Sequence, residues 1–491
     1  MAQAPGIDPK NAPASAEEAT APREALAALW AAAGGSAEAL GAVTLTGAEP
    51  ALPSSFAVGT AAQVAIAAST LASAEIGRAR GGPAQQVSVD MRHAAAEFRS
   101  ERYLRVEGSA PPDLWDRIAG IYRCGDGGWV RLHTNFAHHR DGVLRLLGCT
   151  HERAAVQRAL EGWAALDFEA AAAEAGLVVA ALRSFHEWDA HPQGRAMAAL
   201  PVLSIDRIEP AGEGAPPEPL PALGAGEPVL AGLRVLDLTR IIAGPVAGRT
   251  LAAQGADVLL ITAKHLPAIA PLVIDTGRGK RSAQIDLRGA DGRRALAALV
   301  KGADIFVQGY RPGGLSALGF GPGELARLRP GIVVASLSAY SHAGPWAYRR
   351  GFDSLVQTAS GFNVAEGAAC GSALPRPLPA QALDHASGYL LALGIQRALL
   401  RRTAEGASWH VRVSLAQTGR WLRGLGRVPN GPTVHDPTFD DVADLIEEGP
   451  SGFGRLAAVR HAGRLSVTPP RWERPAVPLG VDAPEWRLRG R

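Results

Sequence analysis

The sequence predicts an α/β fold: a doubly wound, Rossmann-like parallel sheet with a second, smaller α/β domain. After residue 230, short apolar runs rich in β-branched residues alternate with helical segments, which is typical of parallel strands joined by right-handed crossovers. A chain of 491 residues is also too long for a single core. Residues 209–229, dense in Pro, Gly and Glu, form the clearest linker and divide the two parts.

Composition excludes several classes of partner. The net charge of +3 provides no broad basic surface, so we expect no nucleic acid partner. The three cysteines are scattered without a CxxC pair, which argues against a disulfide scaffold or thiolate metal site and favours a reducing, cytoplasmic location. Because the chain has neither a signal-peptide pattern nor about 18 consecutive strongly apolar residues, we expect no membrane partner.

The first half contains two kinds of segment. Residues 1–22, rich in Ala, Pro and Glu, are predicted to be disordered. Residues 52–82 form a turn and a long Ala-rich helix closed by glycines, and a strand at 85–91 follows. Residues 109–208 then alternate short strands and amphipathic helices. We expect the latter to be the smaller α/β domain, closed by a strand at 200–205.

The second half predicts the sheet strand by strand. Buried strands are expected at 233–239, 257–262, 281–287, 304–310 and 331–340. Parallel sheets bind ligands at the carboxyl ends of their strands. Those ends carry Thr239, Arg240, Thr262, Gly309, Tyr310, Arg311, Ser338 and Tyr340. The sequence therefore places a candidate binding site at this edge.

An internal repeat relates the two halves at an offset of 324 residues, which aligns Val87 with Val411 and Gly82 with Gly406. Each copy reads as a long helix, a glycine, a strand and a second helix. The same offset pairs Thr60 with Asp384, so the first copy keeps the architecture and lacks the carboxylate. Any chemistry of that carboxylate is thereby restricted to the second copy.

Asp384 stands with His385 at the head of the apolar helical segment 378–400. Asp favours helix N-caps, so one interpretation is purely structural. The other interpretation is a nucleophile, and the local sequence leaves both open. His385 faces another direction on the helix, so adjacency alone does not make a catalytic pair.

Other polar groups allow both structural and functional interpretations. Arg278, Lys280 and Arg281 stand among glycines before a strand, where they either contact a polyphosphate or form a solvated surface. Asp353 reads as the cap of its own helix. The histidines at 133, 138 and 139 lack a partnering Cys and regularly spaced acids, so we expect packing within the smaller domain and no metal.

Six stretches in the second half occur in the order of a known family: 232–258, 275–288, 302–320, 329–340, 344–362 and 383–400. As a set they resemble the class III CoA-transferases, the family of formyl-CoA transferase and carnitine CoA-transferase that also contains α-methylacyl-CoA racemase. The first half resembles pieces of the same family, so the chain looks like a fused and rearranged tandem form.

The resemblance implies a division of the chain into parts. These are a disordered N-terminus (1–22), a remnant of a first copy (23–108), a small α/β domain (109–208), a linker (209–229), a CoA-binding domain with the catalytic Asp (230–426) and a segment returning to the large domain (427–491). It also implies a homodimer, coenzyme A or acyl-CoA as a substrate rather than a permanently bound cofactor, and a small carboxylic acid as second substrate.

The resemblance further assigns site residues. Asp384 becomes the nucleophile, and the implied CoA contacts are Arg240, Ile241, Ala243, Lys280, Arg281, Gly309 and Tyr310. The implied reaction is CoA transfer from an acyl-CoA to a carboxylic acid through an aspartyl anhydride and an aspartyl-CoA thioester. Because the nucleophile must be ionised, we expect the pKa of Asp384 not to be strongly raised.

Two alternatives remain beside the transferase. A racemase needs a second base, which related racemases carry in a motif like GHD, whereas this chain reads Gly351-Phe352-Asp353. A catalytically inactive CoA-binding relative is favoured by the degenerate first copy. Ala317 favours it too, because the family often has a basic residue there.

Overall fold

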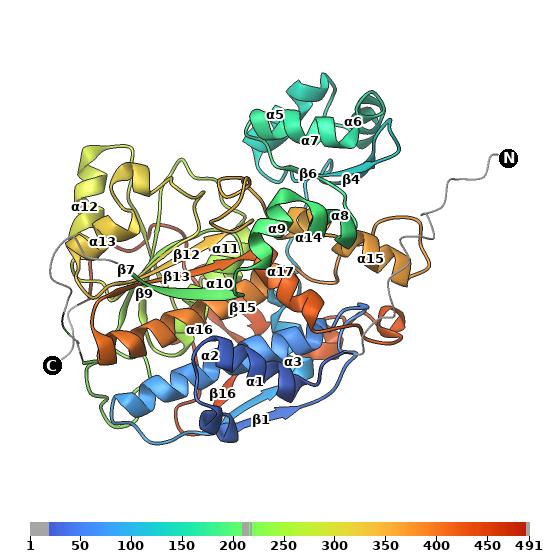
Figure 1. Ribbon diagram of the computed structural model, residues 1–491. Coiled ribbons are helices and arrows are strands. Elements are labelled where there is room, and N and C mark those ends of the chain that lie inside the picture. Colours follow the sequence, from blue (N-terminus) through green and yellow to red (C-terminus); the bar gives the residue numbers. More distant parts are fainter. Residues whose placement is uncertain (1–18, 209–215, 217–218, 488–491) are drawn as a thin grey trace.

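The computed structural model describes residues 19–208, 216 and 219–487. The disorder predicted for residues 1–22 lies outside the described residues as far as residue 18, whereas residues 19–22 are described and a helix begins at Pro22. Most of the Pro- and Gly-rich part of the linker also lies outside the described residues. At the centre is a seven-stranded sheet in the order β10-β9-β8-β11-β12-β13-β7 (Figure 1). Its strands are β7 (Leu203–Ile208), β8 (Arg234–Leu238), β9 (Asp257–Thr262), β10 (Arg281–Gln284), β11 (Ile305–Gln308), β12 (Val333–Ser338) and β13 (Ser408–Ser414).

Six of these strands run parallel, and the strand order reverses between β8 and β11. This order is that of a Rossmann-type sheet, which confirms the predicted fold class. The sequence assigned the strand near residue 200 to the smaller domain. The structure instead pairs β7 antiparallel with β13 at the edge of the large sheet, with Val411 opposite Ile205.

Helices cover both faces of the sheet because its strands are apolar on both sides. Leu236 and Phe306 face one core with α12 (Ala290–Val300) and α13 (Pro322–Leu328). The alternate residues Val235 and Val307 face the other core. That second face carries α10 (Ala243–Ala253) and α16 (Ala382–Glu405). The remaining helices of this part are α11 (Ala270–Thr276), η3 (Ser316–Leu318), α14 (Asp353–Ala359), α15 (Phe362–Ala369) and α17 (Leu415–Gly424).

The N-terminal part packs outside α16. It comprises α1 (Pro22–Ala32), η2 (Ala37–Ala42), β1 (Val43–Thr46), α2 (Val58–Ala79), β2 (Val87–Asp90), α3 (Met91–Glu97), α4 (Ser100–Tyr103) and β3 (Arg105–Val106). α2 lies along α16, as Figure 1 shows. Between these helices Ser73 Oγ donates a 2.5 Å hydrogen bond to Gln396 Oε1, and Gln396 Nε2 donates to Ser69 O at 3.1 Å. These serine and glutamine groups therefore pair with one another across a largely apolar contact.

The structure confirms the internal repeat. Ala57 precedes α2 with φ −75° and ψ 60°, and Gln381, at the same offset of 324, precedes α16 with φ −77° and ψ 60°. Downstream, β2 and α3 follow α2 just as β13 and α17 follow α16. The order of long helix, strand and second helix is thus the same in both copies.

A smaller unit between the copies has its own core. It contains β4 (Gly120–Arg123), β5 (Trp129–Leu132), α5 (Ala137–Leu147), α6 (Arg153–Leu160), α7 (Ala165–Glu174) and β6 (Val179–Ala181). The next two helices, α8 (Phe185–Ala190) and α9 (Pro192–Ala198), contribute Trp188 and Met197 to the main core instead. Val130 and Leu132 of β5 face Phe168 in this core. The opposite face of β5 and β6 contacts α14, so this unit stands beside the carboxyl ends of the large sheet (Figure 1).

The C-terminal residues connect the first copy to the large sheet. Their elements are η4 (Gly431–Thr433), η5 (Asp440–Leu445), β14 (Ile446–Ser451), β15 (Gly454–Val459) and β16 (Arg464–Leu465). β15 pairs with β3 and β16 pairs with β2. Further along, Trp472 lies 4.0 Å from the Arg278 guanidinium, and Trp486 Nε1 donates to Leu299 O. Across the described ranges, none of the helices is both long and apolar enough to cross a membrane.

Candidate active site

Asp384 does not cap α16, contrary to the structural interpretation of its sequence. The helix begins at Ala382, which makes Asp384 its third residue. The N-terminus is capped from outside, because Asp384 N donates a 2.9 Å hydrogen bond to Asp353 Oδ2. Asp353 is the first residue of α14 and is fully buried. The cap that Asp353 was expected to give its own helix is given to α16 instead.

The carboxyl group of Asp384 has no hydrogen-bond partner among the residues that the structure describes. Its residue is 7% exposed, yet within the described residues no donor is bonded to either carboxyl oxygen. The group lines a cavity of about 350 Å³ at the carboxyl ends of the strands. A buried carboxyl that lacks a hydrogen bond carries an energetic cost and is therefore a candidate for ligand contact.

The environment of Asp384 opposes ionisation. Burial is the main cause, and the neighbouring carboxylates of Asp353 and Glu101 add to it, so its pKa lies well above the ordinary range. The expectation that this pKa would not be strongly raised is wrong. Glu101 comes from the first copy and is held at 3.1 Å by His385 Nε2. The first copy thus contributes a charge to the site of the second.

The first turn of α10 lies beside Asp384 because Gly388 permits close packing. A Cβ at Gly388 would lie 2.6 Å from Ala243 O and 2.7 Å from Val246 Cβ. Just before α10, Ile241 has φ 76°, a backbone conformation that is an outlier for a β-branched residue. Strained backbone of this kind concentrates at functional sites. The turn directs the N-terminus of α10, with its positive end, to the cavity.

Gly388→Ala tests this close packing. The added methyl group would force α10 away from α16, and we expect both the thermal unfolding midpoint and ligand binding to fall, with a loss of roughly 1–3 kcal/mol in unfolding free energy. Thermal unfolding with and without CoA measures both quantities. Gly424→Ala is the matched control, since no atom lies near a Cβ at that helical glycine. Equal stability of the two variants would contradict the packing argument.

The sequence-predicted contacts fall into two groups. Five of them line the cavity together with Asp384: Arg240, Ile241, Ala243, Gly309 and Tyr310. They come from the loop after β8 and the loop after β11, the two strands between which the sheet order reverses. Convergence at this point is expected for a ligand site of a doubly wound sheet.

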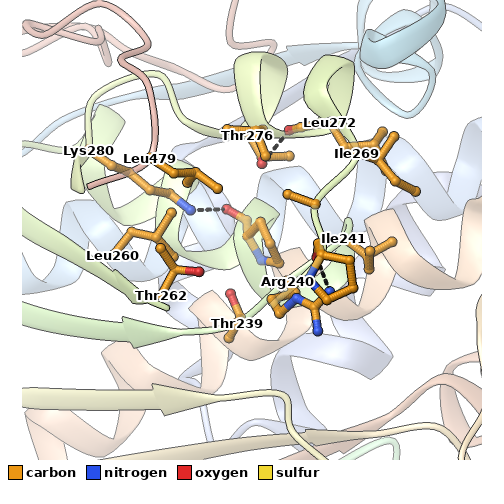
Figure 2. A pocket seen from close by; sticks show the side chains of 14 residues that line it. Thr239, Arg240, Ile241, Leu260, Thr262, Ile269, Leu272, Thr276, Lys280 and Leu479 are labelled. Carbon is orange, nitrogen blue, oxygen red and sulfur yellow. Dashed lines mark hydrogen bonds between the residues drawn. The ribbon is translucent and has the colours of Figure 1, made fainter. Parts of the chain in front are cut away.

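Lys280 and Arg281 have protein partners. Lys280 Nζ donates to Asp237 Oδ2 and to Pro245 O, both at 2.8 Å, and its side chain is 2% exposed. It lines a neighbouring, mainly apolar cavity of about 40 Å³ that also touches Arg240 and Ile241 (Figure 2). Arg281 forms a two-pronged ion pair with Asp257, with both distances 2.9 Å. Their assignment as CoA contacts stays a prediction.

Sequence reasoning missed the contribution of the smaller unit. Phe136, His138 and His139 line the same cavity as Asp384. The rings of His133 and Phe352 stack with centroids 3.8 Å apart and bridge the smaller unit to the start of α14. The dense cluster of histidines at 133–139 was the one sign of this contribution in the sequence. The sequence does not show that these histidines lie near Asp384, which is more than 240 residues away in the chain. Among the residues with described positions, no group of side chains suited to hold a metal ion assembles.

The cavity is positively charged. Arg240, Arg311, Arg349 and Arg350 line it, whereas Asp384 is the acidic residue of the lining. Arg349 is paired with Glu169 at 3.3 Å. The other three arginines have no carboxylate partner in the described part of the chain. An anionic ligand would therefore be attracted to this cavity.

Comparison with known proteins matches this part of the chain. Residues 230–425 match the family model described as CoA-transferase family III. A Mycobacterium tuberculosis protein named "Probable fatty acyl-CoA transferase Rv3272" is 34% identical over 38% of this chain and 50% of its own length. An acyl-CoA transferase of Gibberella moniliformis is 29% identical over 67% of this chain and 64% of its own length.

Further matches are of the same kind. A succinate–glutarate CoA-transferase of Agrobacterium fabrum is 30% identical over 38% of this chain and 51% of its own length. A crystal structure of Rv3272 from M. tuberculosis aligns with a TM-score of 0.38 and 33% identity over 40% of this chain and 56% of that chain. The chain thus spans between about half and two thirds of the length of these curated relatives. Residues 230–425 of this chain are thus similar to CoA-transferase family III.

Proposed function

We propose that this protein transfers CoA from an acyl-CoA thioester to a carboxylic acid, with Asp384 as the covalent nucleophile. The observation that carries the proposal is the unpartnered Asp384 carboxyl, 7% exposed, in a cavity lined by cations. The match of residues 230–425 to the family model of CoA-transferase family III supports it. So do the names of relatives that transfer CoA between acids.

The reaction proceeds by two exchanges on Asp384. A carboxylate oxygen of Asp384 attacks the thioester carbon, the C–S bond breaks, and CoA leaves as thiolate from an acyl-aspartyl anhydride. The thiolate then attacks the aspartyl carbonyl, which releases the donor acid and leaves an aspartyl-CoA thioester. The acceptor carboxylate reverses these two steps, so that its CoA ester leaves and the Asp384 carboxylate is regenerated.

Several features of the fold fit these steps. Arg240, Arg311 and Arg350 attract the phosphates of CoA. The N-terminus of α10, beside the strained Ile241, offers unpaired backbone N–H groups to phosphate or to a developing oxyanion. The raised pKa of Asp384 means that its ionised form is high in energy, and a nucleophile that is destabilised in the ground state has a lower barrier to attack.

This pKa predicts the pH dependence. Only ionised Asp384 attacks, so kcat/KM should keep rising with pH through the range above the ordinary aspartate pKa, because burial and the neighbouring carboxylates raise the pKa of Asp384. Asp353→Asn should shift the rise to lower pH, because it removes the largest charge that opposes ionisation while keeping an oxygen for the cap. A flat wild-type profile over this range would refute the assignment.

Isotope exchange tests the function without knowledge of the acceptor. An acyl-CoA is incubated with its own labelled free acid, and the label should enter the thioester because the first exchange is reversible. Acetyl-, succinyl-, formyl- and a long-chain fatty acyl-CoA form a suitable panel. Exchange with at least one of them, and none with Asp384→Asn, is the expected result. Absence of exchange across the panel would favour a CoA-binding protein without transferase activity.

A second candidate function arises from the same cavity. The sequence offered no base for α-proton transfer, since Phe352 occupies the place expected for one. His139 lines the cavity with Asp384 and is the side chain that such chemistry would have to use as its second base. Deuterium entering the α-carbon of propionyl-CoA in deuterated water, without label exchange into the thioester, would support this chemistry instead.

A further inference from the structure

His139 occupies an unusual position in the cavity. It is the third residue of α5, is 4% exposed, and lines the same cavity as Asp384. Aromatic neighbours fix its ring: the His138 centroid lies 4.0 Å away, that of Phe136 6.3 Å and that of Phe352 6.5 Å. Phe352 precedes Asp353, which caps the helix of Asp384. The imidazole is therefore held rigidly on the wall of the site.

Neither ring nitrogen of His139 has a hydrogen bond within the described ranges. Nδ1 is buried in the protein, whereas Nε2 is accessible. A buried imidazole without any partner is costly and uncommon. A group that enters the cavity and bonds to Nε2 would remove that cost.

The protonation state follows from the surroundings. Burial first, and then the charges of His138, Arg350 and Arg240, lower the pKa of His139 to about 4, so the ring is neutral near pH 7. A neutral imidazole carries one N–H. Because an enclosed N–H without an acceptor is less tolerable than an enclosed lone pair, we assign the proton to Nε2. His139 thus presents a neutral N–H donor to the cavity.

We propose that Nε2–H of His139 donates a hydrogen bond to the acyl oxygen of the substrate while the Asp384 carboxylate attacks the acyl carbon. The inference rests on the proposed function and adds a catalytic residue from the smaller unit. As the bond from the Asp384 oxygen to the acyl carbon forms, the carbonyl electron pair moves onto the acyl oxygen. It returns when the thiolate leaves, and the proton remains on Nε2 throughout. Neutral imidazoles and other fixed donors stabilise such oxyanions elsewhere.

The same features disfavour His139 as the base for α-proton removal. A ring whose protonated form is destabilised by burial and by two arginines is weakly basic. It gains little by taking a proton from carbon. Donation from Nε2 requires no change of charge on the ring and suits a site that is already cationic.

The first test observes the hydrogen bond directly. The full chain carrying Asp384→Asn, in which the acyl group stays intact, is labelled with ¹⁵N-histidine and titrated with acetyl-CoA and with free CoA. Acetyl-CoA should shift one Nε2–H proton signal downfield and slow its exchange, while free CoA should not. The signal should be missing when His139→Gln is added. A signal that free CoA induces equally, or that never appears at saturation measured by calorimetry, would overturn the proposal.

The second test is kinetic. With the acyl-CoA that gives the fastest isotope exchange, His139→Leu should lower kcat roughly 100-fold, in the range for loss of one oxyanion donor, and leave the affinity for free CoA unchanged. His139→Gln, which keeps an N–H donor, should recover part of kcat. The matched control is His186→Leu, an exposed histidine on α8. Wild-type kcat in His139→Leu would overturn the proposal.

The two tests separate this inference from the function on which it rests. If isotope exchange fails with every acyl-CoA in the panel, the proposed transferase function is lost. If exchange proceeds and the Nε2–H signal does not respond to the acyl group, the function stands and the role of His139 is refuted. Thermal unfolding of each variant identifies a loss of kcat that is due to misfolding.

Discussion

Asp384→Asn is expected to abolish isotope exchange and, at the same time, to stabilise the protein. The amide cannot form an anhydride, so exchange should fall to the background rate. The wild-type carboxyl is buried without a hydrogen bond, and its raised pKa makes ionisation costly in the folded state. Removing it should raise the unfolding free energy at pH 7 by roughly 1–3 kcal/mol. Chemical denaturation and the exchange assay measure the two effects.

The pH dependence of this gain has a defined sign. A carboxyl whose folded pKa is raised binds its proton more tightly in the folded state, so wild-type stability falls as pH rises above about 4, the unfolded value. The advantage of Asp384→Asn should therefore be smallest near that pH and grow toward neutrality. Thr60→Val, at the same place in the first copy, is the matched control and should leave exchange intact. A less stable Asp384→Asn at every pH would contradict the account.

Lys280→Met is expected to cost roughly 3–5 kcal/mol of unfolding free energy, because it leaves the Asp237 carboxylate buried and unpaired. Asp237 is fully buried, and its two oxygens accept from Lys280 Nζ at 2.8 Å and from Thr239 Oγ1 at 2.5 Å. The pair joins the end of β8 to the start of α10 through Pro245 O. Urea denaturation at neutral pH measures the loss.

The double variant Lys280→Met with Asp237→Asn separates two roles of Lys280. If the lysine mainly neutralises Asp237, the double variant should recover most of the stability and much of the CoA affinity. If Lys280 contacts CoA, as the family resemblance implies, CoA affinity should stay low in both variants while stability recovers. A single Lys280→Met variant as stable as the wild type would contradict the structural role.

The repeated backbone and the sheet were accessible from sequence because they depend on local patterns. Short continuous apolar runs after residue 230 mark strands that are buried on both faces, and the offset of 324 residues aligns α2 with α16, whose preceding residues have the same backbone angles. The loops after β8 and β11 could be assigned to one site because parallel strands place their ends together. Arg240 and Tyr310 meet there.

The electrostatics of the site were not accessible, because they depend on residues far apart in the chain. Asp353 caps α16 across 31 positions, and Glu101 acts on Asp384 across more than 280. The carboxylates of Asp353 and Glu101 both raise the pKa of Asp384, and no local sequence pattern predicts either contact. His139 reaches the cavity only because β5 and β6 of the smaller unit pack on α14. Self-association and the compartment of the protein remain predictions.

Trapping the intermediate on Asp384 tests the central claim most directly. Hydroxylamine is added during turnover with the acyl-CoA that supports exchange, and the peptide containing residues 378–400 is examined by mass spectrometry. The account predicts a hydroxamate on Asp384, formed only when acyl-CoA is present and absent from Asp384→Asn. Continued acid exchange with Asp384 unmodified, or modification at another carboxylate such as Asp353, would contradict it.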